Sequence, residues 1–470
     1  MKKIISLILS LIFISSLVFT VSCAQQEEEI FDQNFHVEYE IDMTGQHFVW
    51  GSTWDQEICP SADFSIVGDK IHKRFRDLKE KYGCTIEVIN WEDGSGRSLQ
   101  EVAAGRHTID LIDSHADAGG IQLYKAGLLY ALEDITNVDW SNEKFGVPRF
   151  LQYSIFDGKQ YGFYHYAWEF PPEYHGVLMF NTDMLRSFGV QIPHEFKETG
   201  NWNWATFKDY LISIEEAERN NGDDSNFYPY ISGDSYAADA IGYMFANGCK
   251  MIEKDAGGNY VFGFDNGAGM EAVDFLADLF KSGLYVQKGA GTFSVDQQSA
   301  MMSHETYWAT HYYEKDSSQN YLPAQEYAYG LISFPHGPHG DANSVSGYVH
   351  HHRRLNWILN QSANSPDEIG LVLDFVFEPL DDSNGWRDFL KDQIFYTTED
   401  HENYVYMLEN VNFSYGTVYL DKGFSTFTSG LNSAVAGRKS VSEVFSSAKT
   451  AIDEAIRNNV TWVYEDLITE

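Results

Sequence analysis

Basic residues are scarce in this chain of 470 residues, which has 32 Lys and Arg against 69 Asp and Glu and a formal net charge of −37. Nucleic acids and anionic membrane surfaces are bound through basic patches, so the composition argues against both as partners. A strongly anionic ligand is disfavoured for the same reason. Two explanations of the acidity remain, a neutral or cationic ligand and simple surface solubility.

Cysteine is also rare, with four residues at Cys23, Cys59, Cys84 and Cys249. No C-x-x-C pair occurs, which excludes the common zinc and thioredoxin-like patterns. A disulfide between Cys59 and Cys84 and a set of free buried thiols both stay open.

Catalytic signatures are missing as well. The sequence has no H-E-x-x-H, no G-x-S-x-G, no Walker loop and no G-x-G-x-x-G after a strand. The histidines at residues 350–352 stand next to Arg353 and Arg354, which would repel a metal cation. We therefore expect that the protein binds no metal and no cofactor and is not an enzyme. The pair Glu169 and Glu305 keeps one alternative open, a glycoside hydrolase, because its chemistry needs two carboxylates across a cleft.

The N-terminus has the pattern of a secretory signal. Lys2 and Lys3 precede an apolar run over residues 4–21, and a small residue followed by Cys23 closes it. We predict a signal peptide over residues 1–22. The closing residues resemble a bacterial lipobox, which implies a lipid on Cys23 and an extracytoplasmic protein anchored to the bacterial cell membrane.

Thr20 stands where that motif usually has Leu, Val or Ile, so an uncleaved anchor and plain secretion stay open. Residues 23–45 follow as a predicted lipidated tether, because their acidic side chains repel one another and extend the chain. No later apolar run reaches the ~20 residues that a spanning helix needs.

The rest of the chain alternates predicted strands and helices. Strands are expected at 47–50, 84–89 and 108–113, with helices at 64–82 and 99–104 between them. This order is typical of a mostly parallel sheet with helices on its faces. About 425 residues exceed what one core supports, so two domains are expected.

A longer motif lies at residues 158–211. A strand approach breaks at Pro171 and Pro172, an apolar strand follows at 177–180, and a helix begins with Asn181 or Thr182 as its N-cap. The letters FNTDML, FGV and WNWATF resemble the hinge crossover of bacterial extracellular solute-binding proteins of the sugar-binding family 1.

Weaker motifs of that family follow in the same order, among them AAGRHTIDL at 103–111, GLISFPHGP at 330–338 and a helix capped by Ser365 with Pro366 in its first turn. The resemblance covers roughly residues 46–460. It implies an α/β, two-lobed periplasmic-binding-protein-like fold of type II, in which each lobe is a mixed sheet flanked by helices and hinge strands cross between them.

The same resemblance implies the domain limits and the function. Lobe 1 is expected to hold residues 46–165 and 340–385, and lobe 2 residues 175–335 and 386–470. The protein is expected to be a monomeric receptor of an ABC importer, which captures a carbohydrate, with an oligosaccharide favoured, and delivers it to permease subunits in the membrane. A receptor for a peptide or another small solute is the further alternative.

Aromatic residues supply the candidate site, since the chain has 29 Tyr, 32 Phe and 11 Trp. The C–H face of a pyranose stacks on an aromatic ring, and its hydroxyls need polar, multidentate partners. Core packing is the alternative for each aromatic residue. The residues expected to contact ligand are Trp50, Trp54, Asp113, His115, Asp117, Trp168, Glu169, Tyr174, Tyr236, Tyr307, Trp308, Tyr348, Phe424 and Phe427.

Overall fold

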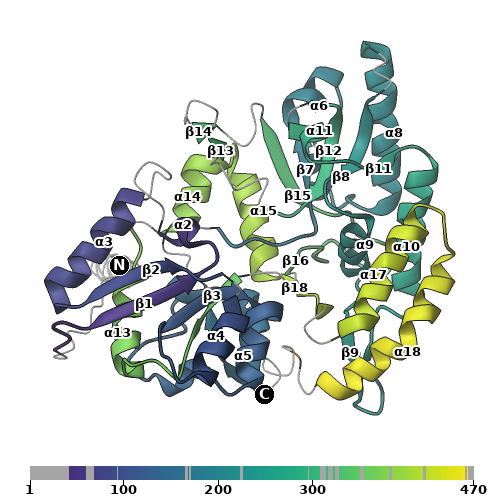
Figure 1. Cartoon of the computed structure of the whole chain (residues 1–470). Coiled ribbons are helices and arrows are strands. Elements are labelled where there is room, and N and C mark those ends of the chain that lie inside the picture. Colours follow the sequence, from purple (N-terminus) through teal and green to yellow (C-terminus); the bar gives the residue numbers. More distant parts are fainter. Residues whose placement is uncertain are drawn as a thin grey trace, which may run out of the picture. The chain divides into compact units, whose positions relative to one another are not determined.

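The structure is a computed structural model (Figure 1). It describes residues 42–59, 68–92, 94–164, 168, 171–222, 226–294, 296–306, 314–315, 321–322, 328–349, 354–380, 384–416, 420–460 and 463. The predicted signal peptide, the lipid on Cys23 and most of the tether lie outside these ranges and stay predictions. Among the helices described, none has both the length and the apolar composition needed to cross a membrane.

The first sheet has five strands in the order β2-β1-β3-β17-β6. They are β1 (His47–Ser52), β2 (Thr85–Asn90), β3 (Leu111–His115), β6 (Gly162–Phe163) and β17 (Arg354–Ile358). Strands β1, β2 and β3 are parallel, whereas β17 runs antiparallel to both β3 and β6. The sequence predicted the first three strands within a few residues.

Three main helices accompany this sheet, α3 (Gly68–Tyr82), α4 (Gly94–Ala103) and α13 (Pro366–Val376). Helix α13 begins as predicted, because Ser365 and Glu368 form a reciprocal capping box and Pro366 occupies the first turn. Its other end is closed by Arg74 of α3, whose guanidinium donates to the carbonyls of Phe375, Glu378 and Pro379 at 2.8–2.9 Å. The two helices are thus joined as well as packed.

The second sheet has the order β11-β8-β12-β7-β15. Its strands are β7 (Val177–Asn181), β8 (Tyr228–Ser232), β11 (Tyr285–Gln287), β12 (Ser299–His304) and β15 (Tyr329–Ser333). Strand β7 is buried along its whole length, as its unbroken apolar sequence predicts for a strand covered on both faces. It runs antiparallel to β12 and β15, while β8 is parallel to β12 and β11.

The helices that follow these strands begin at side-chain caps. Asn181 accepts from the Met184 amide at the start of α6, which confirms one of the two predicted N-caps. Asn203, Ser235 and Asn266 cap three further helices in the same way. The helices are α6 (Thr182–Phe188), α8 (Trp204–Asn221), α9 (Tyr236–Ala246), α10 (Gly267–Lys281), α15 (Thr398–Glu409), α17 (Asp421–Val435) and α18 (Val441–Asn459).

Helices α17 and α18 pack on one another and on α10, as the yellow pair at one side of Figure 1 shows. The remaining short helices and strands are α2 (Asp55–Ile58), α5 (Ile121–Lys125), β4 (Ile155–Phe156), β5 (Lys159–Gln160), α7 (Pro193–Glu198), β9 (Ile252–Lys254), β10 (Tyr260–Phe262), α11 (Gly291–Ser294), β13 (Glu314–Lys315), β14 (Tyr321–Leu322), β16 (Tyr348–Val349), α14 (Trp386–Phe389) and β18 (Asn412–Phe413). The 3₁₀ and π segments are η1 (Ala116–Gly120), η2 (Leu132–Asp134), η3 (Glu143–Phe145), η4 (Phe150–Ser154) and η6 (Leu390–Ile394).

Three chain segments that run between the two sheets are joined to one another by hydrogen bonds. His175 and Tyr348 exchange two main-chain hydrogen bonds of 2.9 Å. Strand β16 then pairs in parallel with β18. The Asn412 side chain donates to the carbonyls of Val345 and Gly347, which binds the second segment to the third. We call residues 172–176, 345–349 and 411–414 the crossing segments.

The three cysteines within the described ranges, Cys59, Cys84 and Cys249, are free thiols. Of the two alternatives left by the sequence, the structure has the free thiols and not the Cys59–Cys84 disulfide. Burial raises the pKa of the Cys59 and Cys84 thiols to about 11. Both are therefore protonated and unreactive at neutral pH.

Helix α7 is held to α15 by a buried histidine. His194 Nδ1 lies 3.0 Å from a carboxylate oxygen of Glu399, and its Nε2 lies 3.3 Å from Asp400. Burial of the imidazole lowers the pKa of His194, but the hydrogen bond and charge of Asp400 and the charge of Glu399 outweigh it, so the pKa is raised.

We expect this contact to make stability depend on pH. Because the folded-state pKa of His194 is raised, its contribution is complete below the unfolded value of about 6.5 and is lost as pH rises through the folded value. The Tm of the wild type should fall as pH rises above about 6.5, and in the His194→Gln variant this fall should be smaller by on the order of a few degrees. Melting curves from pH 5.5 to 8.5 measure it. His339→Gln, which removes an exposed partner of Glu271, should leave the profile unchanged, and equal profiles for both variants would refute the prediction.

Candidate functional site

Four polar side chains share one face of the first sheet at its edge. Ser52 ends β1 and is the Cα partner of Asp113, and Arg354 begins β17 as the partner of His115. Paired residues point to the same face of a sheet, and so do residues two apart on one strand. Ser52, Asp113, His115 and Arg354 are therefore brought together by register alone.

The centre of this group is a buried ion pair. Arg354 Nη2 lies 2.8 Å and its Nε 3.1 Å from Asp113 Oδ2, and the Ser52 hydroxyl donates to the same oxygen at 2.7 Å. The Asp113 side chain has no exposed surface, whereas that of Arg354 is 18% exposed. The carboxylate is thus occupied by protein partners, and the cation beside it is balanced.

Trp54 completes the group. Its main-chain amide donates to the Ser52 hydroxyl at 2.9 Å, and its indole lies 4.9 Å from the His115 ring in a stacked geometry and 4.4 Å from the Arg354 guanidinium. Cation–π attraction and stacking fix the orientation of the ring while leaving it half-buried. Only the part of the indole that these two partners leave exposed can stack on a flat apolar ligand face.

A second group lies at the edge of the second sheet. His175 Nδ1 is 3.6 Å from Asp234, which follows β8, and its Nε2 is 3.4 Å from Glu305, which follows β12. The Glu305 amide donates to His304 Nδ1 at 2.7 Å, and the Tyr348 ring stacks at 5.5 Å from that of His175. Side chains of Asp234 and Glu305 keep 41% and 24% of their surface exposed.

A short stretch of chain links the two groups. Tyr348 and Val349 lie beside His175, and Arg354 follows Val349 by five residues, which span at most about 17 Å. We call the two sets the Trp54 group (Ser52, Trp54, Asp113, His115 and Arg354) and the His175 group (His175, Asp234, His304 and Glu305). Within the described part of the chain, no set of three or more His, Cys, Asp or Glu side chains is placed to hold a metal.

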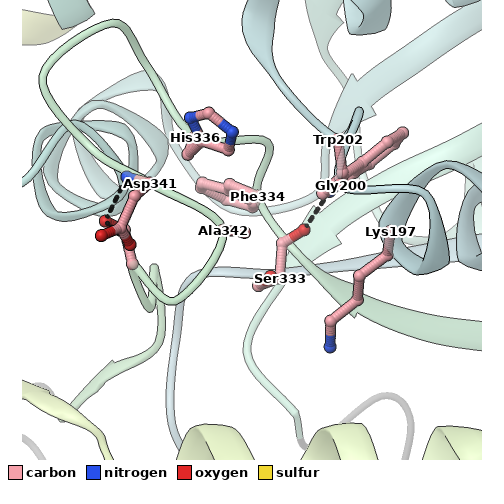
Figure 2. A pocket seen from close by; sticks show the side chains of 9 residues that line it. Lys197, Gly200, Trp202, Ser333, Phe334, His336, Asp341 and Ala342 are labelled. Carbon is pink, nitrogen blue, oxygen red and sulfur yellow. Dashed lines mark hydrogen bonds between the residues drawn. The ribbon is translucent and has the colours of Figure 1, made fainter.

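Two hollows lie elsewhere. The first, beyond the end of β15, has about 20 Å³ of space, roughly enough for one water molecule, and Figure 2 shows its wall where the Trp202 indole donates to the Ser333 carbonyl at 2.8 Å. The second, of about 410 Å³, is lined by Arg387, which is paired with Glu143 and Glu409. In both, the polar groups named are engaged with one another.

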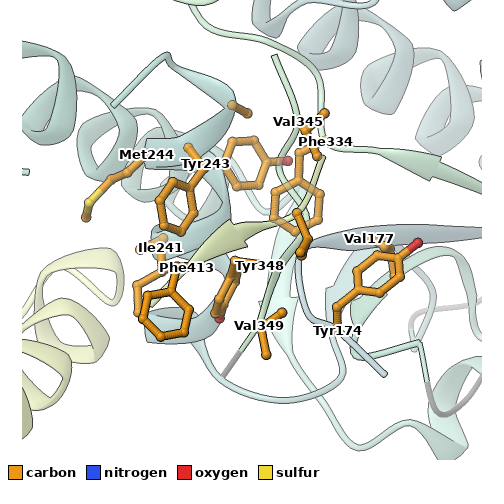
Figure 3. Packing of buried hydrophobic residues seen from close by; sticks show 14 of the residues in the cluster. Tyr174, Val177, Ile241, Tyr243, Met244, Phe334, Val345, Tyr348, Val349 and Phe413 are labelled. Atoms are coloured by element: carbon orange, nitrogen blue, oxygen red, sulfur yellow. The ribbon is translucent and has the colours of Figure 1, made fainter. Parts of the chain in front are cut away.

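Three of the residues predicted from the sequence, Trp54, Asp113 and His115, come together in the Trp54 group. Tyr348 and Tyr174 belong to the crossing segments, where both are buried in the packing that Figure 3 shows. The Tyr174 hydroxyl donates to the Tyr404 carbonyl at 2.8 Å, and that of Tyr348 donates to the Ala238 carbonyl at 3.0 Å.

Five more of the predicted residues are buried side chains of the core. The rings of Trp50 and Trp168 lie 5.7 Å apart, and both pack against Phe377. Trp50 lies on β1, two residues before Ser52. Tyr236 packs on Phe280 and Tyr285. The others are Phe424 and Phe427 of α17. In this structure all five side chains pack in the core, which was the alternative to ligand contact for each aromatic residue.

Glu169, Tyr307, Trp308 and the side chain of Asp117 lie outside the described residues, so their part in a site stays a prediction. Conversely, the candidate ligand contacts did not include Ser52, Arg354, His175, Asp234 or Glu305. All five lie at or next to the end of a strand, and this position in the sequence could have marked them as candidates.

Neither a protein-family profile nor a curated protein sequence matches the chain. Solved structures do match. The cyclic alpha-maltosyl-1,6-maltose binding protein of Arthrobacter globiformis has a TM-score of 0.63 at 14% identity, covering 88% of this chain and 99% of its own. UgpB of Mycobacterium tuberculosis, in complex with glycerophosphocholine, has a TM-score of 0.61 at 14% identity over the same shares.

A third match is an extracellular solute-binding protein family 1 structure from Alicyclobacillus acidocaldarius, with a TM-score of 0.54 at 13% identity, covering 88% of this chain and 98% of its own. The fold is that of the two-lobed sugar-binding proteins. This confirms the predicted fold class, while the limits of the two lobes stay a prediction. The Trp54 group lies on the first sheet, and the His175 group joins the ends of β8 and β12 in the second sheet to a crossing segment.

Proposed function

We propose that this protein is the substrate-binding receptor of an ABC importer and that it captures a carbohydrate between the Trp54 and His175 groups. The observation that carries the proposal is the placement of an oriented, half-buried indole at the sheet edge of lobe 1 and of exposed carboxylates beside a histidine at that of lobe 2. The indole supplies the stacking surface, and the carboxylates accept hydroxyl hydrogens.

Charge supports a neutral saccharide. In the two groups, Arg354 is balanced by Asp113, while two carboxylates, those of Asp234 and Glu305, lie beside the one imidazole of His175. An anionic sugar would meet these carboxylates and a chain of net charge −37. Among the proteins of this fold, that of Arthrobacter globiformis carries a cyclic maltosyl-maltose in its name, so an oligosaccharide is the first candidate.

The remaining parts of the proposal rest on the sequence. They are a lipid on Cys23 after a signal peptide, delivery of ligand to membrane permease subunits, a monomeric extracytoplasmic receptor, and additional lining by Asp117, Glu169, Tyr307 and Trp308. Lobe rotation about the crossing segments would close the site, with the closed form selected by the contacts that ligand makes only there.

A panel of mono- and oligosaccharides tests the proposal by thermal shift, with thin-layer chromatography of each mixture. A ligand of the native state raises Tm by mass action, and the sugar should be recovered unchanged. Hydrolysis of a panel sugar by the pure protein would overturn the receptor in favour of a glycoside hydrolase. The absence of any shift across the panel would end the carbohydrate assignment.

For any sugar that binds, Trp54→Ala should weaken affinity by about 10-fold or more, because the stacking surface is lost. Isothermal titration calorimetry measures the change. Tyr396→Ala is the matched control, since Tyr396 is 54% exposed and packs on Tyr329 at the opposite end of β15 from Ser333. Equal affinities for the two variants would remove Trp54 from the site.

A further inference from the structure

A cluster of buried polar side chains lies directly behind the His175 group. Six residues from β8, β12, β11 and α9 form it, and none is more than 3% exposed. They are Tyr230, Ser232, Asp239, Tyr243, Tyr285 and Ser303. Five carry hydroxyls, and Asp239 is the one carboxyl among them.

Asp239 is the acceptor at the centre of this cluster. One oxygen, Oδ2, accepts hydrogen bonds from the Tyr285 hydroxyl and, at 2.7 Å, from the Ser303 hydroxyl. Burial raises the pKa of Asp239 to about 7; the hydrogen bonds from Tyr285, Ser303 and Ser232 lower it, and the nearby charge of Asp234 raises it again. No cation of the described residues offsets the carboxylate charge.

The hydroxyl oxygens of Tyr230, Ser232 and Tyr243 are buried as well, and Ser232 lies close enough to Asp239 to lower the pKa of its carboxyl. The cluster therefore holds polar groups that a change at Asp239 can reorganise. Burial keeps the tyrosine pKa values well above 10, so Asp239 is the cluster member that titrates near neutral pH.

The cluster is continuous with the two carboxylates of the site. Ser232 and Ser303 are Cα partners on β8 and β12. Asp234 follows Ser232 by two residues, and Glu305 follows Ser303 by two. The Gly233 amide donates to the Ser303 carbonyl at 2.8 Å, which joins the two strand ends at the serine whose hydroxyl donates to Asp239.

We propose that Asp239 is a proton-controlled positioning residue, which holds the ends of β8 and β12, and with them Asp234 and Glu305, in place while it is protonated. Its consequence for a ligand rests on the proposed function, whereas its effect on the strand ends does not. The sign follows from linkage: a raised acid pKa gives stability that is complete below the unfolded value of about 3.9 and is lost as pH rises through about 7.

The test uses ligand-free protein, so it is decided even if no sugar binds. We expect Tm to fall between pH 5 and pH 8, and deuterium uptake in peptides 228–236 and 299–306 to rise over the same interval after correction for intrinsic exchange. In Asp239→Asn both changes should shrink. Asp278→Asn, which removes a carboxylate of α10 that pairs with Lys208 on the surface, should behave as the wild type. His194 titrates in all three proteins and cancels in the comparison.

A second variant decides the matter if Asp239→Asn does not fold. Tyr285→Phe removes one hydrogen-bond donor to the carboxylate, which should move the midpoint of the pH dependence to higher pH. The inference is overturned if the pH profiles of Tm and uptake in Asp239→Asn match those of Asp278→Asn, or if Tyr285→Phe leaves the midpoint where it was.

Discussion

Replacing Arg354 with methionine is expected to lower the free energy of unfolding by about 3–5 kcal/mol, because it leaves the Asp113 carboxylate in a buried position without its cation. The Ser52 hydroxyl would remain as a partner at 2.7 Å, but one neutral donor does not replace an ion pair. Urea titrations followed by fluorescence give the change, with a steady m-value as the sign that the folded state is otherwise kept.

Arg387→Met is the matched control. Arg387 also bridges carboxylates, those of Glu143 and Glu409, but both partners are close to half exposed and the pairs are screened by water. Its loss should lower stability by about 0–1 kcal/mol. Adding Asp113→Asn to Arg354→Met should recover much of the lost stability. A loss no larger for Arg354→Met than for Arg387→Met would show that the Asp113 charge is not confined as described.

The second large effect is expected at Gly176, in the first crossing segment. This residue has φ of +84°, and a Cβ built there would lie 2.2 Å from the Ser346 carbonyl oxygen. The Ser346 hydroxyl in turn donates to the Gly176 carbonyl at 2.5 Å and accepts from the Phe334 amide at 2.7 Å. Gly176→Ala must therefore push two crossing segments apart as well as strain its own backbone.

Gly189→Ala separates those two costs. Gly189 closes α6 at φ of +70°, and nothing lies within 4 Å of a Cβ built there. The free energy of unfolding of Gly189→Ala should therefore fall only by the cost of the left-handed backbone, about 1–2 kcal/mol. Gly176→Ala should lose several kcal/mol in total, on the order of twice that or more. Denaturant unfolding of the two variants measures the difference, and near-equal losses would contradict the clash.

Local signals carried most of the fold. The alternation of apolar residues, the caps at Asn181 and Ser365, and the helix-ending glycines give elements that depend on nearby residues alone, and they were predicted within a few positions. The pairing of β17 between β3 and β6 joins residues that are roughly two hundred or more positions apart. No local pattern encodes such a pairing, and the resemblance implied only that residues 340–385 return to lobe 1.

The site was harder for the same reason. Asp113 could be placed at a strand end, but its partner Arg354 is set by register across the sheet. In the sequence Arg354 stood out only as a charge beside three histidines. Trp50 and Trp54 are four positions apart and look alike, yet one faces Phe377 in the core and the other remains half-buried beside His115. Trp50 lies within β1 and Trp54 two residues beyond its end, a difference that composition does not reveal.

The place of β17 in the first sheet also orders events during synthesis. Strand β3 ends at His115, but its neighbour β17 begins only at Arg354, so at 5–20 residues per second roughly 10–50 seconds separate their emergence from the ribosome. During that interval one side of β3 has no strand to pair with, and by its end every strand of the second sheet has been made. The first sheet is thus the last of the two sheets to be completed, and a nascent chain stalled before residue 354 would expose the edge of β3 to aggregation or to a chaperone.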